Sequence, residues 1–189
     1  MLSSVLKENT LASHQSLEKV LIAKLKNIKS EENYASVLEI FYGFIAPLEE
    51  KIRQTEIAVV LPDYSSRRTA EWIANDLELL GVQAADVPLC RELPGVVNTF
   101  QALGALYVLE GSTLGGQVIK KMIADRLPGL SPSALSFFGS YNERTAEMWD
   151  RFRQVLNSVS NNSKDVEEAA VETFTEFKNW MIRNEQKEL

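Results

Sequence analysis

Apolar side chains recur at intervals of three and four residues along almost the whole of this 189-residue chain. That interval places them on one face of an α-helix, whereas the alternating or β-branched runs that indicate strands are nearly absent. The pattern therefore predicts an all-α fold. Because the chain has no internal repeat and its length suits one hydrophobic core, we expect a single-domain multi-helix bundle over residues 1–189.

Turn and capping residues divide this pattern into six predicted helices. They run from about residue 3 to 26, from 31 through 48, through 72–77, from 99 to 127, from 143 through 156, and from about 164 to 184. Ser30, Asn98 and Asn142 are the expected N-caps, because their side-chain oxygens can accept hydrogen bonds from free amides of the first turn. Gly81 is expected to end the third helix, and Pro47 to kink or break the second.

The charged residues and the single cysteine exclude several classes of function. Twenty basic side chains against 26 acidic ones give a net charge of −6, without a basic tract, so nucleic acid is not an expected partner. Cys90 alone cannot form an intrachain disulfide or a thiolate metal cluster, which fits a reducing compartment, and we expect a cytoplasmic protein.

No apolar run approaches the ~18 residues of a membrane span, so no membrane association is expected. His14 is the only histidine, which excludes a three-histidine zinc site.

The predicted helix over residues 99–127 contains four of the nine glycines, Gly104, Gly111, Gly115 and Gly116. Each one costs about 0.5–1 kcal/mol of helix stability relative to alanine. At about 100° per residue, the first three form one bare stripe, with Ser112 beside it. Two interpretations stay open: a tight crossing with another helix, or a planar ligand over the helix, with a kink at Gly115 and Gly116. A phosphate-binding loop fits poorly, because no strand precedes the glycines.

His14 is also ambiguous by itself, since most lone histidines on a partly apolar face are structural. Glu18 lies four residues later on the same helical face. Its carboxylate can accept a hydrogen bond from one ring nitrogen and leave the other as a basic lone pair, as expected of a metal-ligating histidine. A surface His–Glu pair would have the same sequence.

Two stretches together resemble bacterial heme oxygenases, the biliverdin-forming kind that is often associated with bacterial phytochromes. Residues 6–18, LKENTLASHQSLE, resemble the family's proximal helix, and residues 103–117, LGALYVLEGSTLGGQ, resemble its distal helix. The resemblance implies that His14 is the axial ligand of heme iron, with Glu18 beside it. It also implies that Gly111, Ser112 and Gly115 are catalytic residues on the distal face of the heme, and that Gly116 contacts the heme there.

The family pattern further places basic residues at the heme edge, where they pair with the propionates. Lys7, seven residues before His14, matches one such position, and Arg153 matches another. The chemistry is consistent, because carboxylates at a pocket mouth are well held by a cation and a guanidinium fork. In one respect the chain departs from the pattern: many heme oxygenases carry an aspartate where this chain has Ser112. A hydroxyl donates and accepts hydrogen bonds but supplies no fixed negative charge.

The resemblance implies an enzyme that degrades heme to biliverdin, carbon monoxide and iron, with heme as both cofactor and substrate. The implied partners are an electron donor, such as a ferredoxin or a flavin reductase, and a phytochrome that receives the biliverdin. One alternative is a non-catalytic heme-binding sensor or carrier of the same fold. Another is a helical enzyme for a small organic substrate, similar in fold to thiaminase-like proteins, but Cys90 has no neighbouring histidine to activate it.

Overall fold

The computed structural model describes residues 1–185, and every regular element in that range is helical. The α-helices are α1 (Leu2–Asn9), α2 (Leu11–Lys26), α3 (Glu31–Arg53), α4 (Ile57–Val60), α5 (Ala70–Leu79), α6 (Thr99–Gly111), α7 (Thr113–Arg126), α8 (Ser136–Gly139), α9 (Thr145–Ser158) and α10 (Ser163–Glu185). Short 3-10 turns are η1 (Tyr64–Ser66), η2 (Ala84–Asp86), η3 (Pro132–Leu135), η4 (Asn142–Arg144) and η5 (Ser160–Asn162). The prediction of an all-α fold is confirmed.

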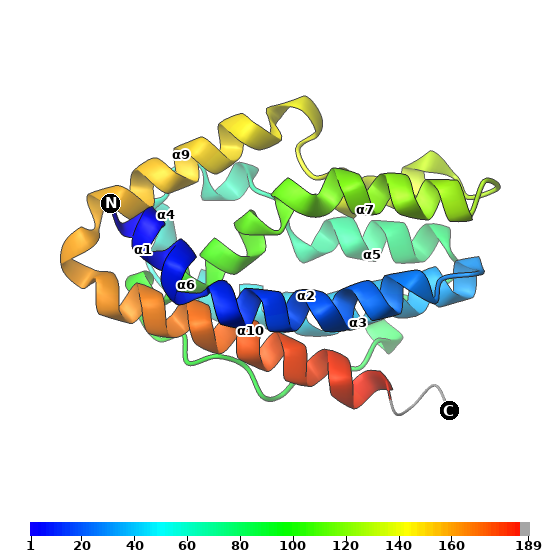
Figure 1. Ribbon diagram of the computed structural model, residues 1–189, viewed down its shortest axis with the longest axis horizontal. Helices are drawn as coiled ribbons and strands as arrows, with labels where there is room; N and C mark the ends of the chain where they lie inside the picture. The colour runs from blue at the N-terminus through cyan, green and yellow to red at the C-terminus, as the bar shows by residue number, and fades with distance from the viewer. Residues whose placement is uncertain (186–189) are drawn as a thin grey trace.

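The long helices form two groups that run along the molecule (Figure 1). Helices α2, α3 and α10 lie on one side, and α5 and α7 lie on the other. Helix α10 packs against both α6 and α2, α3 packs against α5, and α1 packs against α9 and α10 near the N-terminus. None of the helices in the described range is both long and apolar enough to cross a membrane.

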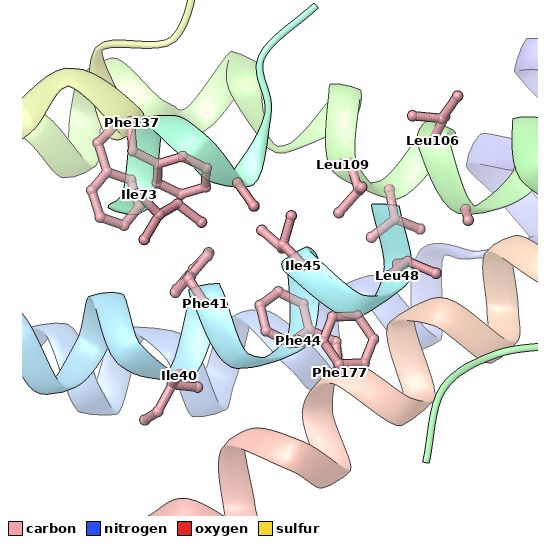
Figure 2. Close-up of a cluster of buried hydrophobic side chains, with 14 of the residues drawn as sticks. Ile40, Phe41, Phe44, Ile45, Leu48, Ile73, Leu106, Leu109, Phe137 and Phe177 are labelled. Carbon is pink, nitrogen blue, oxygen red and sulfur yellow. The ribbon is translucent and has the colours of Figure 1, made fainter. Parts of the chain in front are cut away.

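Helix α3 supplies the centre of the hydrophobic core, as Figure 2 shows. Phe44 stacks on Phe177 of α10 with ring centroids 4.5 Å apart, and Phe41 meets Phe177 and Phe137 edge to face. Five apolar or aromatic residues that recur along this helix at intervals of three and four residues are all buried: Tyr34, Leu38, Phe41, Ile45 and Leu48. The apolar spacing therefore identified the central helix and its buried face correctly.

Pro47 does not break α3, contrary to one of the outcomes that the sequence suggested. A proline has no N–H for the carbonyl four residues earlier, which here belongs to Gly43. The backbone N–H of Cys90 donates to that oxygen at 2.7 Å instead. A bond from a distant segment thus satisfies the carbonyl, and the helix continues to Arg53.

Several predicted helix ends are confirmed and one is wrong. The side chains of Ser30 and Asn98 accept hydrogen bonds from the first-turn amides of α3 and α6. Gly81, with φ of +79°, follows α5, and its N–H and that of the next residue bond back to the last turn. Asn142 caps no helix, because it begins η4 with φ of +53°, and α9 starts only at Thr145. The first predicted helix is divided at Thr10.

The crossing of α6 and α10 requires the absence of a side chain at Gly104. A Cβ atom there would collide with the carbonyl oxygen of Val166 and would lie 2.9 Å from the Cβ atom of Ala169. Both groups belong to α10, and neither is the end of a flexible side chain. The tight-crossing interpretation is therefore correct for this glycine.

Substitution Gly104→Ala should lower the stability of the protein, because the added methyl group forces α6 and α10 apart. Overpacking of this kind costs ~1–3 kcal/mol, and each kcal/mol lowers Tm by about 2–4 °C in a chain of this size. The control is Gly129→Ala, since a Cβ atom at Gly129 meets nothing within 4 Å. Thermal unfolding followed by circular dichroism checks the pair. Equal Tm values for the two variants would contradict this account of the crossing.

Candidate functional site

A pocket of about 600 Å³ lies between helices α1 and α2 and the region where α6 joins α7. This volume is within the range of roughly 300–1,000 Å³ that small-molecule and cofactor sites have. Its apolar lining comes from several elements, including α3, α8 and α10, and contains Phe41, Ile45, Phe137, Phe138 and Phe177. The same aromatic residues belong to the hydrophobic core, so the pocket opens directly onto the centre of the fold.

His14 lines this pocket from α2, and its side chain is 49% exposed. One ring nitrogen, Nε2, lies 3.4 Å from Oε1 of Glu18, and the ring lies 5.3 Å from that of Phe174. The His–Glu pair that the spacing predicted is therefore present. Among the described residues, no group of three or more His, Cys, Asp or Glu side chains could hold a metal ion. A metal ion at His14 would have to bring its other ligands with it.

The facing part of the pocket contains bare backbone at Gly111 and Gly115. A Cβ atom at Gly115 would meet nothing within 4 Å, and one at Gly111 would meet only the Trp149 ring, at 3.8 Å. Among the described residues, neither position has a contact close enough to exclude a side chain, so a tight helix crossing does not explain these two glycines. Their bare backbone leaves room for a ligand to approach without meeting a side chain.

Gly116 does not line the pocket, although the resemblance assigned it to the heme site. A Cβ atom at Gly116 would lie 2.5 Å from the Phe138 carbonyl oxygen and 2.6 Å from Ser140 Oγ. This glycine therefore accommodates the end of α8, as Gly104 accommodates α10. The four glycines of the predicted helix thus serve two purposes. Gly104 and Gly116 allow other backbone segments to pack closely, and Gly111 and Gly115 face the pocket.

The long helix predicted over residues 99–127 is interrupted at Ser112, between α6 and α7, and not at Gly115 and Gly116. Two hydroxyl groups donate to carbonyls three residues earlier: Ser112 Oγ to Leu109, and Thr113 Oγ1 to Glu110, both at 2.6 Å. Side-chain bonds of this kind compete with the helical ladder and bend helices. The interruption places Ser112 at the pocket.

The two predicted propionate-binding residues line the same pocket from different helices. Lys7 lies on α1 and Arg153 on α9, and these helices pack against each other. The Ser3 N–H of α1 donates to the Asn157 side chain of α9 at 3.0 Å, which ties the two helices together. Arg153 also forms an exposed ion pair with Asp150 at 2.8 Å.

Sequence reasoning missed a polar network behind Ser112. Arg67 is buried and pairs with Glu110 at 2.6 Å and with Asp63 at 3.0 Å. The Tyr141 hydroxyl donates to the other Glu110 oxygen at 2.8 Å. Burial raises the pKa of Glu110, and the Arg67 guanidinium and the Tyr141 hydroxyl oppose that shift. The network fixes the end of α6 relative to the loop before α5.

Arg68, the next residue, was missed as well, and it lines the pocket. Its Nη2 donates to Ser112 Oγ at 2.7 Å and to the Leu109 carbonyl at 3.0 Å, and its Nη1 donates to the Phe137 carbonyl at 3.1 Å. In the sequence, the only feature that points to Arg68 is its position next to Arg67. Two adjacent arginines of this kind look the same as charged residues on a surface. With Lys7 and Arg153, three cationic side chains line the pocket, against the single carboxylate of Glu18. This balance favours an anionic ligand.

Comparison with known proteins gives the family: the profile described as "Heme oxygenase" matches residues 1–183. The chain belongs to the heme oxygenase family. A heme oxygenase from Xanthomonas campestris pv. campestris (strain 8004) is 37% identical to it over 127 residues, which are 66% of this chain and 72% of that protein.

Two solved heme oxygenase structures share the fold. That from Leptospira interrogans has a TM-score of 0.77 at 18% identity and covers 96% of this chain and 98% of its own. That from Neisseria meningitidis, determined with NO and CO bound, has a TM-score of 0.80 at 21% identity and covers 97% and 92%. The family match confirms the resemblance to heme oxygenases, and the two structures share the all-α fold.

The adjacent glycines Gly115 and Gly116 should respond to alanine in opposite directions in the ligand-free protein. Gly115→Ala adds a methyl group in open space and removes a helix-destabilising glycine, so it should raise stability by about 0.5–1 kcal/mol. Gly116→Ala overpacks against the Phe138 carbonyl and should lower stability by about 1–3 kcal/mol. Chemical denaturation measures both. A loss of stability in Gly115→Ala would show that its bare backbone serves packing.

Proposed function

We propose that this heme oxygenase family member binds heme in the pocket between α2 and the α6–α7 region and degrades it to biliverdin, carbon monoxide and iron. One observation carries the proposal. His14, beside Glu18, shares a pocket with Gly111 and Gly115, and within the described residues no contact at either glycine is close enough to exclude a side chain. A flat ligand that carries its own metal ion suits both sides of such a pocket.

The side chains of the pocket fit heme in their chemistry. His14 supplies one neutral imidazole, and the porphyrin would supply the remaining in-plane nitrogen ligands that the described residues lack. The Glu18 carboxylate lies 3.4 Å from His14 Nε2, and by accepting a hydrogen bond from the ring it would orient the imidazole and raise its basicity. When bound, heme supplies the redox-active iron that activates oxygen, together with the ring that is oxidised.

The cationic and apolar parts of the pocket indicate how the heme would be oriented. Lys7 and Arg153, on the paired helices α1 and α9, are the proposed partners of the two propionates. The aromatic lining from α3, α8 and α10 would cover the apolar edge of the porphyrin and exclude water. In this arrangement His14 would ligate the iron, and the backbone of Gly111, Ser112 and Gly115 would line the facing side of the pocket.

Turnover also requires partners, and these belong to the proposal. A ferredoxin or a flavin reductase would deliver the electrons, and a phytochrome would take up the biliverdin.

Cys90 has no part in this chemistry: it is buried, does not line the pocket, and its thiol donates to the Glu92 carbonyl at 3.2 Å.

The direct test is conversion of hemin by the purified protein. With ascorbate as reductant and catalase to remove free peroxide, we expect the hemin absorbance to decay and the biliverdin absorbance to appear. A protein that binds hemin with an intact His-ligated spectrum but forms no biliverdin would be a sensor or carrier, and the catalytic part of the proposal would be wrong.

Substitution His14→Ala should leave the helical fold intact and remove the histidine-ligated heme spectrum, because the chain has no other imidazole. The control is Gln15→Ala, an exposed neighbour on α2 that does not line the pocket. Absorbance and resonance Raman spectra of the hemin complexes measure the difference. An unchanged spectrum in His14→Ala would contradict the assignment of the axial ligand.

Substitutions Lys7→Gln and Arg153→Gln should each weaken hemin binding about fivefold to tenfold, because each removes a charge-assisted bond to a carboxylate near the pocket mouth. Arg151→Gln is the matched control, since Arg151 lies on the same helix α9 and is 53% exposed but does not line the pocket. Hemin titration followed by fluorescence quenching gives the dissociation constants. An equal loss of affinity in Arg151→Gln would mean that net charge, and not propionate pairing, is responsible.

A further inference from the structure

Two adjacent arginines in the loop before α5, Arg67 and Arg68, have opposite surroundings. The Arg67 side chain is 1% exposed, and two carboxylates, those of Asp63 and Glu110, pair with it. Arg68 is half-buried and lines the pocket, and within residues 1–185 it forms no ion pair with a carboxylate. Its guanidinium carbon lies 4.1 Å from the centroid of the Phe137 ring, so the group is held flat against an aromatic face.

The anchor points of Arg68 come from the protein backbone. Leu109 and Phe137 accept from its Nη atoms through their carbonyl oxygens, and its own N–H donates to the Tyr141 hydroxyl at 2.7 Å. These bonds fix the guanidinium at the interruption between α6 and α7. The carbonyl acceptors carry no net charge, so the positive charge of Arg68 is not neutralised by direct contact.

The Ser112 hydroxyl is not a free donor in this arrangement. Its proton is directed to the Leu109 carbonyl at 2.6 Å, and its oxygen accepts from Arg68 Nη2. A hydroxyl has only one proton to donate. Within the described residues, Arg68 uses three of its five guanidinium N–H donors in side-chain hydrogen bonds, so it keeps donors from which a ligand beside Ser112 can accept.

We propose that Arg68 is the charged hydrogen-bond donor that stabilises an anionic ligand of bound heme on the Ser112 side of the pocket. The inference rests on the proposed heme binding. In chemical terms, the guanidinium would place a fixed positive charge beside the ligand, at the position where Arg68 now contacts the Ser112 hydroxyl. A charge-assisted bond of this kind is stronger than one from a neutral hydroxyl.

Azide binding to the ferric hemin complex tests the proposal without turnover. Arg68→Met removes the charge, and we expect azide to bind about tenfold more weakly, which corresponds to about 1.4 kcal/mol. Arg68→Lys keeps the charge but loses the planar fork of the guanidinium, so it should recover part of the azide affinity that Arg68→Met loses. The control is Arg144→Gln, which removes one positive charge at a side chain that is 64% exposed and does not line the pocket.

Ser112→Ala separates the two possible donors, and it applies even if Arg68→Met fails to fold. This variant removes the acceptor that occupies Arg68 Nη2, so we expect azide to bind as tightly as before or up to about fivefold more tightly. If Ser112 itself were the donor, the same variant would bind azide more weakly.

Each outcome has one meaning. Weakened azide binding in Arg68→Met, partial rescue in Arg68→Lys and no loss in Ser112→Ala support the proposal. Unchanged azide affinity in Arg68→Met, or a loss in Ser112→Ala, overturns it. Failure of the unsubstituted protein to bind hemin at all would overturn the proposed function, and the spectrum before azide is added distinguishes that case.

Discussion

The packing of α10 against both α6 and α2 determines where the two sides of the pocket lie. Gly104 brings the α6 backbone close to α10, and Phe174 and Phe177 of the same helix line the pocket. Because α10 touches the helix that carries His14 and the helix that ends at Gly111, it sets their separation. The opening is therefore a consequence of the core packing, and a ligand does not have to create it.

The distribution of charge follows from which side chains are already paired. Glu110 is the buried carboxylate closest to the interruption of the helix, and Arg67 and Tyr141 bond to its two oxygens. This pairing fixes the loop that carries Arg68. Among the described residues, Lys7, Arg68 and Arg153 line an aromatic cavity whose one carboxylate, Glu18, lies beside His14; Arg153 also pairs with Asp150 outside it. A planar, dicarboxylic ligand matches that combination of apolar surface and positive rim.

Helical periodicity predicted the elements that depend on local sequence, and it did so for physical reasons. Lys7, His14 and Glu18 are separated by seven and four residues, so one stretch of helices carries all three to the pocket. Periodicity could not tell which glycines meet another helix, because Gly104 and Gly116 differ from Gly111 and Gly115 only in their distant neighbours. Arg68 lies in a loop whose path depends on Tyr141 and on backbone carbonyls far along the chain, and no local pattern encodes such contacts. The interruption at Ser112 depends on the side-chain hydrogen bonds of Ser112 and Thr113. The sequence instead indicated a kink at Gly115 and Gly116, because glycine is the more familiar cause of one.

The position of iron in a crystal of the hemin complex tests the central claim most directly. The anomalous scattering of iron locates the metal independently of how the protein around it is interpreted. The account predicts one iron peak in the pocket, within bonding distance of a ring nitrogen of His14, with the porphyrin between α2 and the Gly111–Gly115 backbone. An iron peak outside this pocket, or one inside it that His14 does not ligate, would contradict the account.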